Sequence, residues 1–103
     1  MKLKIYSVLD SAVGAYLQPF FARSEGEAVR MLKLAVNDPA SNFNKHAQDY
    51  TLAFLGSFDD ETGDLENATR SNLLNLSSLQ EAEKPDIDMM KHFMQPALKQ
   101  SSE

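Results

Sequence analysis

The fold of this chain is decided by residues 19–39, Pro19-Phe-Phe-Ala-Arg-Ser-Glu-Gly-Glu-Ala-Val-Arg-Met-Leu-Lys-Leu-Ala-Val-Asn-Asp-Pro39. Ser24 and Glu27 have capping-box spacing, in which the hydroxyl accepts an amide of the first turn and the carboxylate accepts the cap amide. A residue before a proline avoids the helical region, so the pattern ends near Asp38. Apolar residues lie between these limits at helical spacing: Ala28, Met31, Leu32, Ala35 and Val36. The stretch therefore predicts an amphipathic helix over about residues 24–37.

Two strand patterns precede this helix. Residues 2–9 alternate, which places Lys2, Lys4, Tyr6 and Val8 on one face and Leu3, Ile5, Ser7 and Leu9 on the other. Residues 16–23 form a second strand rich in aromatic side chains. Pro19 lies inside it and has no amide to donate, so this strand is expected at a sheet edge or with a bulge. The short loop between the two strands predicts a hairpin.

Two further strand patterns follow the helix. Residues 50–58 are apolar on both faces, with Tyr50, Leu52, Phe54 and Phe58 predicted on one of them. A strand of this kind is expected in the centre of a sheet. Gly63 can adopt the positive φ of a tight turn, after which residues 64–67 return as a short fourth strand.

Together these elements predict an α+β fold, with an antiparallel sheet in the chain order ββαββ and one helix packed on one face. The helix has to pack on the sheet, because an isolated helix of this length is marginal in water. Residues 1–67 are predicted to form the α+β domain. Residues 68–103 are predicted to form an acidic C-terminal extension, irregular or short-helical and partly disordered. We expect a homodimer, since a second copy or the C-terminal segment should occupy the other sheet face or the edge strand with Pro19.

The composition is that of one small globular domain: 103 residues, 43% hydrophobic and 24% charged. There is no cysteine, which excludes disulfides and thiol nucleophiles and fits a cytoplasmic protein. The net charge of −5 is uneven, with +1 on residues 1–58 and −6 on residues 59–103. This balance is unfavourable for strong non-specific binding to duplex DNA. No apolar run approaches 18 residues, so no membrane span is expected.

Catalytic and metal chemistry find little support in the sequence. Oxygen ligands for a cation could come from an acidic cluster, Asp59, Asp60, Glu61 and Asp64. The EF-hand pattern fails there, because Asp64 stands at the glycine position and Arg70 at the final glutamate position. A solvated hairpin turn explains the cluster better. The sequence also contains no nucleophile elbow, phosphate loop or dinucleotide fingerprint. We therefore expect no enzyme activity, no cofactor and no metal.

Nucleic-acid binding is the one site chemistry that the residues favour. Lys2, Lys4 and Tyr6 share one strand face, Tyr16 is expected across the hairpin, and Arg23 is free for a partner. A basic, aromatic sheet face holds single strands by stacking and phosphate contacts. A plain solvated face or a dimer contact is the alternative that these residues leave open. The consensus of RNA-recognition domains is absent around Phe54–Phe58.

Several stretches are specific in combination: Met1–Asp10, Gln18–Ala28, Val36–Pro39, Asp49–Leu52 and Leu55–Gly63. Together they resemble the small non-structural protein of gokushovirus-type microviruses, tailless phages with single-stranded circular DNA. The resemblance covers about residues 1–66. It implies a protein made in the host bacterial cytoplasm and absent from the virion, acting in viral single-stranded DNA synthesis or in the switch from replication to packaging. DNA binding is sometimes attached to that family, and no catalytic residues are carried over.

Two functional hypotheses follow. The first is an accessory factor that contacts single-stranded DNA or the viral replication complex through Lys2, Lys4 and Tyr6. The second is a protein-interaction factor that binds a host or viral protein through its acidic hairpin and tail. Salt-dependent binding to a single-stranded oligonucleotide distinguishes them.

Overall fold

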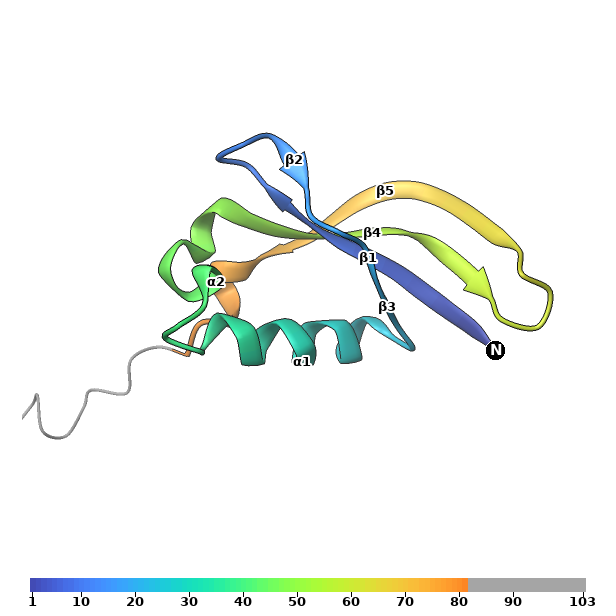
Figure 1. Cartoon of the computed structure of the whole chain (residues 1–103), viewed down its shortest axis with the longest axis horizontal. Helices are drawn as coiled ribbons and strands as arrows, with labels where there is room; N and C mark the ends of the chain where they lie inside the picture. Colours follow the sequence, from blue (N-terminus) through green and yellow to red (C-terminus); the bar gives the residue numbers. More distant parts are fainter. Residues whose placement is uncertain (82–103) are drawn as a thin grey trace, which may run out of the picture.

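The computed structural model describes residues 1–81 and shows one main helix packed on an antiparallel sheet (Figure 1). The strands are β1 (Lys2–Asp10), β2 (Ala15–Tyr16), β3 (Phe20–Ala22), β4 (Tyr50–Asp59) and β5 (Leu65–Asn75). The helices are α1 (Glu25–Val36) and the short α2 (Asn42–Lys45), with 3₁₀ turns η1 (Ala47–Asp49) and η2 (Leu76–Leu79). The predicted α+β class is confirmed. The C-terminal extension was predicted from residue 68, and its residues 82–103 lie outside the part that the structure describes.

The first edge of the sheet is an interrupted strand. The strand order is β2-β1-β4-β5, and β3 also pairs with β1. Leu9 faces Tyr16 and Ile5 faces Phe21, so β2 and β3 follow the same edge of β1 with one extra residue between them. The gap contains Pro19, as predicted for a residue that cannot donate to a ladder. Counting β2 and β3 as one interrupted strand gives a chain order consistent with ββαββ.

Hydrogen bonds hold this interruption against β1. The amide of Leu17 donates to the carbonyl of Val8 at 2.8 Å. The carbonyl of Leu17 accepts from Ser7 Oγ at 2.6 Å, which satisfies a serine buried in the sheet. A buried hydroxyl without a partner would be costly, so this bond fixes the path of the edge.

Helix α1 begins where its cap predicts. Ser24 Oγ accepts from the Glu27 amide at 3.1 Å, while the Glu27 carboxylate accepts from the amide of Arg23 at 2.9 Å rather than from that of Ser24. Three residues spaced by four are buried: Ala28, Leu32 and Val36. Met31, predicted in the same stripe, is exposed because it lies about 100° around the helix from Leu32.

The core lies between α1 and one face of the sheet. The largest fully buried apolar side chains are Tyr6 of β1, Leu52 of β4, Leu76 of η2 and Val36 of α1. Phe43 of α2 packs edge-on against Tyr50 with 4.7 Å between ring centroids, which closes one end of this core. We call the face of the sheet under α1 the covered face, and the other the open face.

Strand β4 is central, as predicted, but it changes phase along its length. Tyr6 faces Phe54, whereas Ile5 faces Gly56, so Leu55 is an extra residue. A bulge of this kind reverses which side chains point to which face beyond it. Phe58 was predicted on the side of Leu52, but it faces Leu3 and lies on the open face.

Strand β5 continues past the predicted domain boundary at residue 67. It runs to Asn75 instead of ending at residue 67, and most of its side chains are exposed. Its backbone pairs with β4 from Phe58↔Leu65 to Thr51↔Asn75. Because the strand is held by this pairing and buries few side chains, its sequence shows little apolar alternation. Leu76 then enters the core. The predicted division between residues 67 and 68 therefore falls inside this strand.

Candidate nucleic-acid interface

Tyr6, the aromatic centre of the predicted site, is buried. It is 1% exposed, and its ring lies 5.9 Å from that of Phe20 and 5.5 Å from that of Phe54. Burial raises the pKa of its hydroxyl, with a smaller contribution from the negative charge of Glu25. The alternation of β1 does place Tyr6 on the same face as the two lysines, but that face is the one α1 covers. Tyr6 therefore cannot stack a base.

The start of β1 extends past the N-terminal end of α1, beside the β4–β5 hairpin (Figure 1). Lys2 and Lys4 belong to this part of β1 and pair with Asp59 and Ser57 of β4. Lys2 Nζ lies 3.3 Å from Glu66 Oε1. Ser57 Oγ donates to the same carboxylate oxygen at 3.2 Å. An exposed pair of this kind adds little stability, but its carboxylate repels a phosphate. The covered face is therefore a poor anion site even where the helix does not reach.

The open face carries a different set of side chains. The strand register places on it Leu3, Ile5, Ser7, Leu9, Tyr16, Phe21, Thr51, Ala53, Gly56, Phe58, Leu65 and Asn67. The strand carboxylates Asp10, Asp59 and Glu66 all alternate onto the other face. Within the described strands, the open face thus has no carboxylate, although the whole chain is acidic.

Two aromatic rings are accessible on the open face. Phe21 is 50% exposed, and its ring centroid lies 5.9 Å from that of Phe58. Tyr16 is 37% exposed, and the guanidinium of Arg70 lies 5.4 Å from its ring centroid. Exposed rings on a sheet can stack bases, and an arginine beside them can stack as well or contact a phosphate. This arrangement is suited to a single-stranded nucleic acid.

The Arg70–Tyr16 contact also shows that the sheet is strongly coiled. Arg70 belongs to β5 and Tyr16 to β2, with β1 and β4 between them in the sheet. The small side chains of the paired Ser7 and Ala53 also lie on the open face, yet both are buried. Bulges increase the local twist of a sheet, and both β4 pairings contain irregularities. The open face is therefore partly closed at the Tyr16 end and accessible at the Phe21 end.

The structure divides the five predicted residues. Tyr16 lies on the open face, and Arg23 lies at the exposed turn from β3 into α1. Lys2, Lys4 and Tyr6 belong to the other side. Three residues of the open face were missed: Phe21, Phe58 and Arg70. The alternation of residues 20–22 could have indicated Phe21. Placing Phe58 depends on the bulge at Leu55, and placing Arg70 depends on strand β5, for which the sequence has no clear strand pattern.

The acidic hairpin tip contacts the start of the chain. The amine of Met1 donates to Asp60 Oδ1 at 2.7 Å and to Glu61 Oε2 at 3.3 Å. The hydrogen bond to Asp60 raises the pKa of this amine. The Glu61 amide donates to Asp59 Oδ1 at 2.9 Å, which lowers the pKa of Asp59. Across residues 1–81, no group of three His, Cys, Asp or Glu side chains is placed to hold a metal ion.

Comparison with known proteins assigns this chain to a phage protein family. A family model described as Phage ORF5 protein matches residues 3–79, from β1 to the last residue of η2, so this is a phage protein. The chain belongs to the Phage ORF5 protein family, because the match covers well over half of its length. No curated protein and no solved structure matches it. None of the helices in the described part is long and apolar enough to cross a membrane.

Proposed function

We propose that this chain is a phage accessory protein that binds single-stranded DNA on the open face of its sheet. The observation that carries the proposal is a sheet face with exposed Phe21 and Tyr16, an adjacent Arg70, and no strand carboxylate. Membership in the phage family supports a viral role. The resemblance to gokushovirus-type microviruses supports action in single-stranded DNA synthesis or the replication-to-packaging switch, in the host bacterial cytoplasm.

The spacing of the two rings suggests how a strand would lie. Phe21 aligns with Ile5 and Tyr16 with Leu9, four residues apart along β1. At the rise of an antiparallel strand this is about 13 Å. A single strand following β1 would place one base on Phe21 and another against the Arg70–Tyr16 pair, with phosphates near Arg70 and Arg23. The mechanism is binding only, with no catalytic step, metal or cofactor.

Fluorescence anisotropy with a labelled oligothymidine at several salt concentrations tests the proposal. Phe21→Ala should weaken binding about 5- to 150-fold, since stacking one base on a ring contributes roughly 1–3 kcal/mol. Arg70→Ala should weaken binding and reduce the salt dependence by the equivalent of about one phosphate contact, a slope change of roughly 0.7.

Lys4→Ala is the matched control for Arg70→Ala, because it removes the same charge from the other side of the sheet. Leu34→Ala is the control for Phe21→Ala, because it removes an exposed apolar side chain from α1. Both controls should bind as the unmodified chain does. If Lys4→Ala weakens binding as strongly as Arg70→Ala, the site is not the open face. No binding at low salt ends the proposal.

The second candidate is binding of a host or viral protein through the acidic hairpin. This hairpin projects beyond the end of α1 (Figure 1). The carboxylates of Asp60 and Glu61 at its tip are exposed. A basic partner captured by the unmodified chain and lost with Glu61→Gln would support this function. Retention by Glu61→Gln with loss by Phe21→Ala would favour the open face instead.

We also propose a homodimer, joined at the edge formed by β2 and β3, which leaves the open face of each copy free. Sedimentation velocity should give twice the chain mass of 11.5 kDa at micromolar concentration. A monomer at all concentrations would contradict this. A dimer that is lost with Leu65→Asp would place the contact on the open face, and would then compete with DNA.

A further inference from the structure

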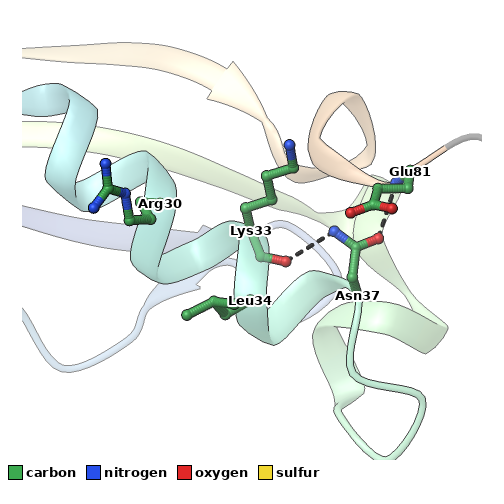
Figure 2. A pocket seen from close by; sticks show the side chains of 5 residues that line it. All are labelled: Arg30, Lys33, Leu34, Asn37 and Glu81. Carbon is green, nitrogen blue, oxygen red and sulfur yellow. Dashed lines mark hydrogen bonds between the residues drawn. The ribbon is translucent and has the colours of Figure 1, made fainter.

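A surface pocket on the outer face of α1 is lined by Arg30, Lys33, Leu34, Asn37 and Glu81 (Figure 2). The hydrogen bonds of Asn37 are completed by the chain itself. Its Nδ2 donates to the carbonyl of Lys33 at 2.9 Å and to that of Leu79 at 3.0 Å. Its Oδ1 accepts from the amide of Glu81 at 2.8 Å. Asn37 therefore has a structural role, because it joins the end of η2 to α1.

A second pocket, of about 370 Å³, differs because it contains polar atoms without partners. Its lining residues come from β1, the edge after β2, the start of α2 and β4: Asp10, Leu17, Ser41, Asn42, Phe43 and Tyr50. Tyr50 is only 9% exposed. Within residues 1–81, its hydroxyl and the side-chain amide of Asn42 form no hydrogen bond. Most buried polar side chains in proteins have a partner, so these atoms indicate a binding site.

Negative charge surrounds the Tyr50 hydroxyl. Asp10 and Tyr50 stand opposite each other at the end of the β1–β4 ladder. Asp10 Oδ1 accepts from the amide of Ala12 at 3.0 Å, which fixes the carboxylate and leaves Oδ2 without a partner among the described residues. Burial raises the pKa of the Tyr50 hydroxyl, and the charges of Asp10 and Asp49 raise it further. Neither carboxylate forms an ion pair in the described part of the chain.

The other wall of this pocket is aromatic and apolar. Ser41 Oγ accepts from the amide of Phe43 at 2.9 Å, which holds Phe43 at the start of α2. The ring of Phe43 meets that of Tyr50 edge-on, and Leu17 adds an aliphatic surface. An aromatic ring beside a carboxylate is favourable for an organic cation. A phosphate is disfavoured, because no lysine or arginine is among the lining residues.

We propose that this pocket binds the guanidinium group of an arginine side chain that a partner protein presents. A guanidinium has enough N–H donors for Asp10, Tyr50 and Asn42 together, and its flat face can pack on an aromatic ring, which an ammonium group cannot do. Free arginine is a poorer ligand, because its α-carboxylate would approach Asp10 and Asp49. The pocket is separate from the open face, since Asp10 alternates onto the covered face.

Titration of the full-length chain with acetyl-glycyl-arginyl-glycine amide, followed by the amide NMR signals of the isotopically labelled protein, tests the proposal. The matched control ligand contains citrulline, which has nearly the same shape as arginine and no charge. The arginyl peptide should shift the amide signals of Phe43 and Tyr50 and bind at least about tenfold more tightly than the citrullyl peptide. Equal affinities, or shifts confined to other parts of the chain, would overturn the proposal. Free arginine that binds as tightly as the blocked peptide would overturn the assignment to a partner protein.

Two conservative variants locate the binding groups. Asp10→Asn keeps an acceptor for the Ala12 amide and should weaken binding of the arginyl peptide at least about tenfold. Tyr50→Phe keeps the ring against Phe43 and should weaken binding about three- to tenfold. Asp64→Asn is the matched control, because it makes the same change in charge at the exposed hairpin turn, and it should bind as the unmodified chain does. If Asp64→Asn weakens binding as much as Asp10→Asn, the peptide is attracted by the overall charge and the proposal is wrong.

Discussion

The covered and open faces of this sheet are built by the same strands, yet one is buried under α1 and the other has exposed side chains. On the covered face, Tyr6, Val8 and Leu52 are buried beneath Ala28, Leu32 and Val36 of α1. On the open face, Phe21 and Leu65 are 50% and 67% exposed. Both faces carry apolar and aromatic residues, so hydrophobicity does not distinguish them. The docked helix does, and an aromatic ring stabilises the fold on one face while it remains available to a ligand on the other.

The largest predicted difference is between one leucine on each face. Leu52→Ala should lower the free energy of unfolding by about 2–5 kcal/mol, because it leaves a cavity under α1. Leu65→Ala should change it by no more than about 0.5 kcal/mol, because that side chain is exposed. Urea unfolding followed by circular dichroism measures both. An equal loss for the two variants would mean that the open face is covered in solution.

Gly56 tests the bulge that assigns Phe58 to the open face. A Cβ at Gly56 would overlap the carbonyl oxygen of Glu66, so Gly56→Ala has to displace β5. We expect a cost of about 1–3 kcal/mol and faster amide exchange along β5. Gly26→Ala is the matched control, because its nearest contact would be Ser24 Oγ at 3.8 Å. A Gly56→Ala protein with unchanged stability and exchange would contradict the close approach of the two strands.

Substitutions of the N-cap residue Ser24 test how much the cap of α1 contributes to the free energy of unfolding. Ser24→Ala removes the acceptor of the Glu27 amide and should cost about 1 kcal/mol in unfolding free energy. Ser24→Asp keeps an acceptor at the same place and should retain most of the stability. Denaturant midpoints of the three proteins measure this. If Ser24→Asp falls as far as Ser24→Ala, the loss does not come from the cap.

The smallest expected effect on stability comes from the ion pair between the Met1 amine and Asp60 at the tip of the β4–β5 hairpin. The hydrogen bond to Asp60 raises the pKa of the Met1 amine above its usual 8.0, so this contribution to stability is complete below about pH 8. It is lost as the pH rises through the higher pKa of the folded state. Asp60→Asn should therefore reduce the decline in denaturant midpoint between about pH 7 and about pH 9. An identical decline in both proteins would show that the pair is not formed in solution.

Much of the architecture was predictable because its signals are local. The Ser24 cap and the apolar spacing after it predicted α1, and Pro19 predicted the break in the edge strand. The alternation of residues 2–9 correctly grouped Lys2, Lys4 and Tyr6 on one face. These features depend on a few neighbouring residues and on the period of the backbone, which a sequence displays directly.

Other features depend on residues far apart in the chain. Strand β5 has few apolar side chains and exists because β4 offers it a free edge, so the sequence suggested an extension from residue 68 instead. The bulge at Leu55 moved Phe58 to the open face, and the coil of the sheet brought Arg70 to Tyr16. Alternation along a strand indicates which side chains share a face. Alternation does not indicate which of the two faces is buried, because that depends on the face against which helix α1 packs.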